Sequence, residues 1–175
     1  FDENDGLNTS PDGGTTVSFT GLNNDCWPAL AMNSTNHNVI YAGRCDGVYR
    51  RDFSSGGWVN TGVRGENRLL TCPSNNQRIY AYGNATLRRT DNETGSWSPT
   101  GPPTHPPSGG QPITDMAVNP SFSGDLYVCV GGYTAGEKVY YSSNAGASWS
   151  NISGSLPNAA CGAITVDNAL GVYVG

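Results

Sequence analysis

The chain has 175 residues and a formal net charge of −5, with nine basic residues against fourteen acidic ones. No basic patch stands out, which argues against nucleic-acid binding, and no apolar stretch approaches the roughly 18 residues of a membrane span. With 24 Gly, 11 Pro and no long apolar run at helical spacing, the composition also excludes a helical fold.

The predicted elements are short strands rich in Val, Ile, Tyr and Trp, separated by polar turns, and they repeat. In chain order they form a strand pair, three sets of four strands and a second strand pair: residues 1–22, 26–62, 68–100, 112–157 and 161–175. A tyrosine marks the second strand of each set and of the last pair: Tyr41, Tyr80, Tyr127 and Tyr173. The period is therefore 39 to 47 residues.

This period with four strands predicts an all-β fold, a β-propeller whose blades are four-stranded antiparallel sheets. Two arrangements fit the strand pairs at the ends. If residues 1–22 complete one blade with residues 161–175, the chain closes into a single domain of four blades. Otherwise the chain is part of a larger propeller or one unit of a repeat array.

The turns between the third and fourth strands share a motif close to Ser-x-Asp-x-Gly-x-Thr-Trp. Its positions are held in the first and last of these turns by Ser10, Asp12, Gly14, Asn144, Gly146 and Trp149, and degenerate versions precede Trp58 and Trp97. The motif resembles the Asp-box, or BNR repeat, of sialidase, sortilin and xyloglucanase propellers. The resemblance implies a structural role, in which Asp or Asn caps turn amides, Gly supplies positive φ and the tryptophans are buried between blades.

The five cysteines show no CxxC or His-paired spacing, so the sequence predicts neither a metal site nor a cofactor. Cys26 precedes a first strand, and Cys45 lies where the second strand of the same unit hands over to the third. Both positions fall on one rim, which predicts a Cys26–Cys45 disulfide. Cys72 and Cys129 lie within strands and are expected to be buried thiols.

Low lysine content and abundant Asn, Ser, Thr and Gly favour an extracellular protein, secreted or at the cell surface. Five N-glycosylation sequons fit that location: Asn8, Asn33, Asn84, Asn92 and Asn151. Asn33 and Asn92 are the best placed for a glycan, because both fall in turns at one rim.

The resemblance also implies where a ligand would bind. Propellers of this kind usually bind ligands on the rim opposite the Asp-boxes, which here selects Trp27, Arg44, Asp46 and Tyr133. The segment from residue 41 to 50 is similar to one that supplies a catalytic carboxylate in xyloglucanase-type glycosidases, which makes Asp46 the catalytic candidate. Glycoside hydrolysis needs a second carboxylate, which would come from a facing domain or blade; within this chain the default candidates are Asp115 and Asp167. The alternative is that Asp46 only caps the turn before Gly47.

Three classes of function remain. The first is a non-catalytic extracellular propeller that binds a glycan or a protein, or that self-associates into an array. The second is a fragment of a xyloglucanase-like glycoside hydrolase, and the third is a sortilin-type receptor ectodomain. The smooth passage from the last strand pair to the first favours the first class, because a ring or an array explains it directly.

Overall fold

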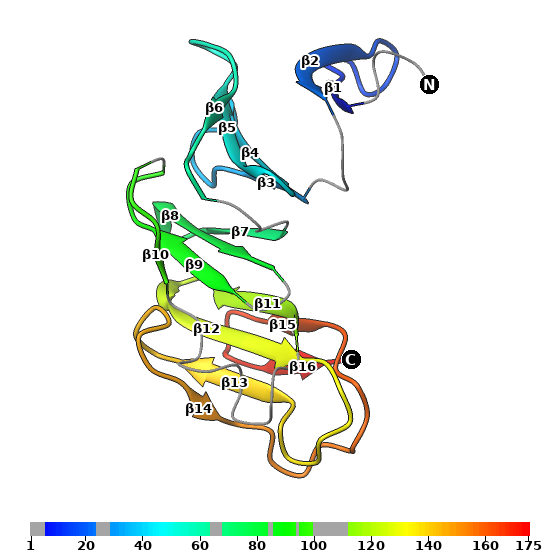
Figure 1. Ribbon diagram of the computed structural model, residues 1–175, viewed down its shortest axis with the longest axis vertical. Helices are drawn as coiled ribbons and strands as arrows, with labels where there is room; N and C mark the ends of the chain where they lie inside the picture. The colour runs from blue at the N-terminus through cyan, green and yellow to red at the C-terminus, as the bar shows by residue number, and fades with distance from the viewer. Residues whose placement is uncertain (1–5, 24–28, 64–67, 84–85, 94, 100–111) are drawn as a thin grey trace.

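The computed structural model describes residues 6–23, 29–63, 68–83, 86–93, 95–99 and 112–175. These residues form sixteen short β-strands and no helix (Figure 1). It follows that no helix within these ranges is able to span a lipid bilayer.

Three complete antiparallel sheets of four strands make up the middle of the described chain. The first sheet contains β3 (Ala29–Met32), β4 (Val39–Arg44), β5 (Gly47–Asp52) and β6 (Val59–Asn60). The second contains β7 (Arg68–Cys72), β8 (Asn75–Tyr82), β9 (Leu87–Thr90) and β10 (Ser98–Pro99). The third contains β11 (Ile113–Asn119), β12 (Phe122–Val130), β13 (Val139–Ser142) and β14 (Ser150–Asn151). In each sheet the strands lie side by side in chain order, as in a propeller blade.

Two further strand pairs flank these sheets. The pair β1 (Gly6–Thr9) and β2 (Ser18–Asn23) lies at one end of the stack, and the pair β15 (Ile164–Val166) and β16 (Val172–Val174) lies at the other (Figure 1). Each pair is a separate two-stranded sheet, so the four-bladed ring considered above is not formed in this structure. The two pairs lie apart from each other in Figure 1.

The repeated tyrosine explains how successive sheets pack. Tyr41 lies opposite Ala31 across β3 and β4, Tyr80 lies opposite Leu70, and Tyr127 lies opposite Ala117. Residues that oppose each other on neighbouring strands share one face of the sheet. This face of each complete sheet is buried against the following sheet, and the tyrosines are only 0%, 0% and 6% exposed.

In the second and third complete sheets and in the last strand pair, the opposite face packs on the sheet that precedes it. Met116 and Val118 of β11 join Tyr80 and Tyr82 of β8 in one cluster. Similarly, Ile164 and Val166 of β15 pack on Ala117 and Tyr127 of the preceding sheet. Side chains of alternating direction thus build hydrophobic clusters at each junction between these sheets, and the fold is an all-β propeller of four-stranded blades.

The sequence predicted that the tryptophans of the third-to-fourth-strand turns are buried between blades; they are partly buried, and Trp97 and Trp149 pack against the hydrophobic clusters between sheets. Trp58 Nε1 donates to the Thr20 carbonyl oxygen in the preceding sheet at 3.0 Å, and Trp97 Nε1 donates to that of Thr61 at 3.2 Å. Trp149 Nε1 donates to the Gly146 carbonyl oxygen of its own turn at 3.2 Å. Each indole thus satisfies its N–H donor while part of the side chain remains exposed to solvent.

Candidate functional site

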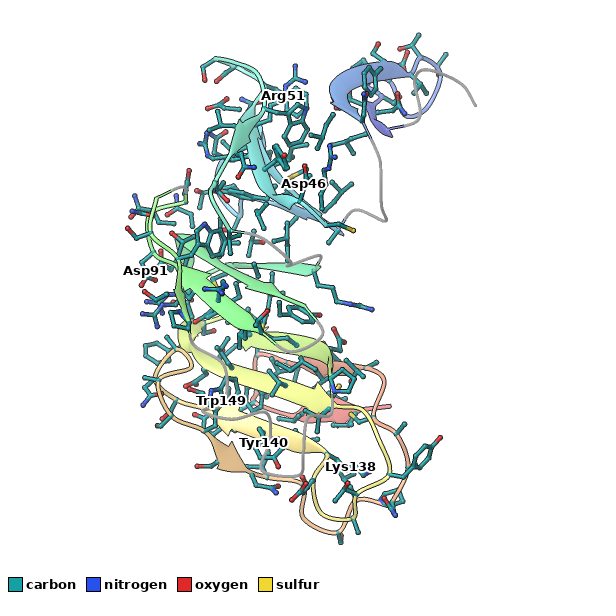
Figure 2. The ribbon with its side chains drawn as sticks, in the orientation of Figure 1. Asp46, Arg51, Asp91, Lys138, Tyr140 and Trp149 are labelled. Carbon is teal, nitrogen blue, oxygen red and sulfur yellow. The ribbon has the colours of Figure 1, made fainter. Side chains whose placement is uncertain are left out.

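Arg44 and Asp46, two of the residues selected from the sequence, come together at the turn between β4 and β5. Arg44 Nε lies 3.0 Å from Asp46 Oδ1, and the Asp46 side chain is 52% exposed (Figure 2). Glycine suits position 47 of this turn because the Cβ atom of any other residue would lie only 2.9 Å from the Val63 carbonyl oxygen. The turn therefore presents one exposed carboxylate beside a fixed cation.

The Arg44 guanidinium group binds to partners within the protein. Its side chain is only 10% exposed, and Nη1 donates to the Asn23 carbonyl oxygen of β2 at 2.6 Å. Its Cζ atom also lies 5.4 Å from the centre of the Tyr49 ring, within cation–π range. Arg44 thus joins the β1–β2 pair to the next blade and holds Asp46, and little of it is left to meet a ligand directly.

Tyr49 is the member of this site that the sequence analysis missed. Its hydroxyl donates to Asp46 Oδ2 at 2.8 Å, so each carboxylate oxygen of Asp46 has a partner within the turn. The hydrogen bond to the Asp46 carboxylate raises the pKa of Tyr49, because it is lost when the phenol ionises. The Asp-Gly-x-Tyr spacing across the hairpin is the sequence signal that could have identified this partner.

The remaining selected residues do not join this cluster. Tyr133 lies in the connection between β12 and β13, two blades further along the chain, and it is 75% exposed. Trp27 lies outside the described residues. The structure thus brings together Arg44 and Asp46 and leaves Tyr133 as a separate exposed aromatic side chain.

The two candidates for a second carboxylate have structural partners. Asp115 Oδ1 accepts from the Tyr82 hydroxyl at 3.1 Å, and Oδ2 accepts from the Ile164 amide at 2.9 Å. Asp167 accepts from the Gly171 amide at 2.8 Å and from the Tyr173 hydroxyl at 3.0 Å, and these bonds lower its pKa. A general acid needs a raised pKa instead. Nor do the described ranges contain a cluster of three or more His, Cys, Asp or Glu side chains suited to a metal ion.

The first Asp-box-like turn is closed by its own side chains. Ser10 Oγ accepts from the Gly14 amide at 2.6 Å, and Asp12 Oδ1 accepts from the Thr16 amide at 2.8 Å. The bonds from Thr16 lower the pKa of Asp12. Gly14 has a φ of 98°, which a residue with a side chain would adopt only with strain.

The last Asp-box-like turn repeats these bonds at equivalent positions. Ser142 Oγ accepts from the Gly146 amide at 2.9 Å, and Asn144 Oδ1 accepts from the Ser148 amide at 2.8 Å. The φ of Gly146 is 86°. All these atoms are used in closing the turn, which supports a structural role for the motif in this chain.

The cysteines differ in state. Cys45 is disulfide-bonded, while Cys72, Cys129 and Cys161 are free and buried. Cys72 and Cys129 are therefore the buried thiols that the sequence predicted. Cys26 lies outside the described residues, so the Cys26–Cys45 pairing stays a prediction.

The sequons differ in accessibility, and Asn33 is poorly placed for a glycan. Asn33 is 1% exposed, and its Nδ2 donates both to the Asn76 carbonyl oxygen and to Glu93 Oε1, at 3.0 and 2.9 Å. Its amide nitrogen is thus occupied between two blades, which corrects the expectation based on its position in a turn. Asn8, Asn92 and Asn151 are exposed, and Asn84 lies outside the described residues.

Comparison with solved structures supports the propeller fold. A GH74 enzyme from Niastella koreensis superposes with a TM-score of 0.72 at 15% identity, covering 97% of this chain and 33% of the enzyme. The GH74 xyloglucanase from Xanthomonas campestris gives a TM-score of 0.63 at 18% identity, covering 84% of this chain and 27% of that structure.

A third similar structure is the extracellular domain of a protein assigned as a hybrid two-component system from B. thetaiotaomicron. It gives a TM-score of 0.69 at 20% identity, covering 98% of this chain and 24% of that domain. The chain thus spans a quarter to a third of the length of these three structures. No protein-family model matches the sequence, and no curated protein matches it either.

Proposed function

We propose that this chain is a non-catalytic module of an extracellular β-propeller that binds a glycan or a protein through the rim carrying Asp46 and Tyr133. The observation that carries the proposal is the Asp46 carboxylate, which is half exposed and yet fixed by Arg44 and Tyr49. A carboxylate held in this way accepts hydrogen bonds from sugar hydroxyls or from a cationic side chain without first having to be ordered.

Tyr133 adds a second contact of a different chemistry. An exposed aromatic ring on a connection between rigid strands can stack on a sugar ring or anchor a protein partner. Because Tyr133 lies two blades from Asp46, a ligand that engages both must be extended across the rim.

An extracellular location is supported by two observations. Cys45 is disulfide-bonded, and disulfides persist mainly in oxidising compartments. One of the similar structures is itself an extracellular domain. We further propose the Cys26–Cys45 pairing and glycan attachment at the exposed sequons Asn8, Asn92 and Asn151.

Affinity electrophoresis in gels containing xyloglucan, with dextran as the control polysaccharide, tests glycan binding. Retardation in xyloglucan that is lost in Asp46→Ala and reduced in Tyr133→Ala would support the proposal. Equal mobility of these variants and the parent chain in xyloglucan would contradict binding of this glycan at this rim.

A second candidate function is that of a part of a GH74-type glycoside hydrolase. It is favoured by the superposition of almost the whole chain on a GH74 enzyme and by the exposure of the Asp46 side chain. The internal partners of Asp115 and Asp167 weigh against either of them as the second carboxylate within this chain. The test is the release of new reducing ends from xyloglucan. Activity that is abolished in Asp46→Asn but retained in Tyr49→Phe would establish a hydrolase function instead.

A further inference from the structure

Two of the three free cysteines lie at the same junction between sheets. Cys129 belongs to β12 and is fully buried, and Cys161 lies in the connection between β14 and β15, where it is 4% exposed. Both side chains belong to the hydrophobic cluster that packs β15 on the third complete sheet. Cys72, the third free cysteine, belongs to a different cluster. The fold therefore brings Cys129 and Cys161 to one place and leaves Cys72 elsewhere.

A single hydroxyl group, that of Thr114, contacts both cysteine residues. It donates to the Cys161 carbonyl oxygen at 2.6 Å, and its oxygen lies 3.3 Å from Cys129 Sγ. Because its one proton is used in the short bond to Cys161, the Thr114 oxygen is available to accept from the Cys129 S–H group. Thr114 thus holds the backbone of Cys161 beside the side chain of Cys129.

The two thiols also interact directly. Burial, followed by a hydrogen bond and a charge interaction with the Cys129 side chain, raises the pKa of Cys161 to about 12. Two neighbouring thiols can share a metal ion or form a disulfide. Among the residues that the structure describes, no group of three or more His, Cys, Asp or Glu side chains could hold a metal ion, so the disulfide is the chemistry that this pair supports.

We propose that Cys129 and Cys161 form a disulfide bond, which ties β12 of the third complete sheet to the connection that leads into β15. The structure holds the pair in its reduced form, and the oxidant is another disulfide, such as oxidised glutathione. The thiolate of one cysteine attacks a sulfur atom of the oxidant, which releases one thiol and leaves a mixed disulfide. The second cysteine then attacks this mixed disulfide and releases the other thiol. Two protein thiols are oxidised, and the oxidant is reduced to two thiols that carry the two protons.

The bond forms mainly while the chain folds. Once the junction has packed, both sulfur atoms are buried and the high pKa of Cys161 leaves almost no thiolate at neutral pH, so exchange with an oxidant is slow. The same burial then protects the closed disulfide from reduction. Cys45 is already disulfide-bonded, which fits a chain that folds in an oxidising compartment. The pairing depends only on the packing at this junction, so it is independent of the rim proposed above to bind a glycan or a protein.

Peptide mapping tests the pairing in the 175-residue chain, produced without glycosylation and refolded in a glutathione redox buffer. Cleavage after Lys and Arg places Cys129 in residues 90–138 and Cys161 in residues 139–175, with no other cysteine in either peptide. After free thiols have been alkylated in denaturant, the two peptides should be linked, with a mass about 2 Da below that of the reduced pair. The chain kept in reductant is the control, in which both cysteines should be alkylated. Separate alkylated peptides from the refolded chain, or a link from either one to Cys72, would overturn the proposal.

A comparison of the folded and the denatured chain shows whether the fold brings the two thiols together. After equilibration at one glutathione ratio, the proportion of linked to unlinked pair should be at least about tenfold higher in buffer than in urea. Cys72→Ala, which removes the free thiol outside this junction, is the matched control and should retain that preference. In Cys161→Ala, Cys129 should be recovered alkylated and not paired with Cys72. Equal proportions in buffer and in urea would show that the fold does not favour this bond, which would also overturn the proposal.

Discussion

Tyr82 of β8 and Asp115 of β11 join neighbouring blades through a hydrogen bond of 3.1 Å between the tyrosine hydroxyl and the Asp115 carboxylate. The same carboxylate accepts from the Ile164 amide of the next strand pair at 2.9 Å, so Asp115 connects three successive sheets. Burial, and then the nearby Asp115 charge, raise the pKa of Tyr82, which keeps its hydroxyl protonated as the donor.

We expect Asp115→Ala to lower the free energy of unfolding by about 1–3 kcal/mol, because it leaves the Tyr82 hydroxyl and the Ile164 amide without this acceptor. Tyr82→Phe should cost about 1 kcal/mol. Urea denaturation measures both changes. Tyr49→Phe removes a tyrosine–aspartate bond of the same kind at the exposed Asp46 and should cost less than about 0.5 kcal/mol. Equal costs at the two sites would contradict the linking role of Asp115.

Trp97 is expected to stabilise the junction between the first two complete blades. It packs against the clusters built on Tyr41 and Val48, and it donates to the Thr61 carbonyl oxygen. Trp97→Ala should lower the free energy of unfolding by about 2–3 kcal/mol, somewhat below the values for fully buried tryptophans, because the ring is half-buried. Trp97→Phe keeps an aromatic ring, loses the N–H donor and should cost about half as much. A cost below about 0.5 kcal/mol for Trp97→Ala would contradict this packing role.

Glu93 combines an ion pair with an unusual backbone conformation. Its carboxylate accepts from Arg50 Nε at 3.0 Å and from Asn33 Nδ2 at 2.9 Å, which ties it to the preceding blade, and its φ is 64°. Glu93→Ala and Glu93→Gly both remove the carboxylate, but only glycine adopts this φ without strain. The Gly variant should therefore be more stable than the Ala variant by about 1 kcal/mol in urea denaturation. The reverse order would show that the backbone is not strained here.

The two Asp-box-like turns form a natural pair for testing pH dependence. Hydrogen bonds from Thr16 lower the pKa of Asp12 in the folded chain, so the stabilisation is present above the unfolded pKa and is lost as pH falls through the folded one. The loss should therefore occur below about pH 4. Amide hydrogen exchange at Thr16 should accelerate there relative to Ser148, whose acceptor Asn144 does not titrate. Asp12→Asn should abolish the difference, and an equal response of both turns in the parent chain would contradict this account.

The repeat was predictable from sequence, and the reason is physical. Strand alternation and the period of Tyr41, Tyr80 and Tyr127 recur in every blade because each blade buries the same face against the next one. The joining of Arg44 and Asp46 followed as well, because a short hairpin leaves residues on either side of its turn close together.

Contacts between blades could not be predicted in this way. Asn33 stands in a turn with an ordinary sequon, yet it is buried because Glu93, sixty residues further on, returns to meet its side chain. The Asp115–Tyr82 hydrogen bond could not be predicted from the sequence either, because the alignment of one sheet on the next depends on the packing of their entire faces. The half-burial of the tryptophans also depends on how far each ring lies from the rim, which the motif does not specify.

The free thiols offer a last prediction. Burial raises the pKa of Cys72 to about 12, and burial together with the neighbouring Cys129 raises that of Cys161 to about 12. Because the thiolate is the reactive species, neither residue should react with iodoacetamide at about pH 8 while the chain is folded. Mass spectrometry should detect alkylation of both in denaturant. Rapid alkylation of Cys161 in the folded chain would show that the β15–β16 pair opens from Ala117 and Tyr127, and that its packing on this sheet is weaker than the buried contacts indicate.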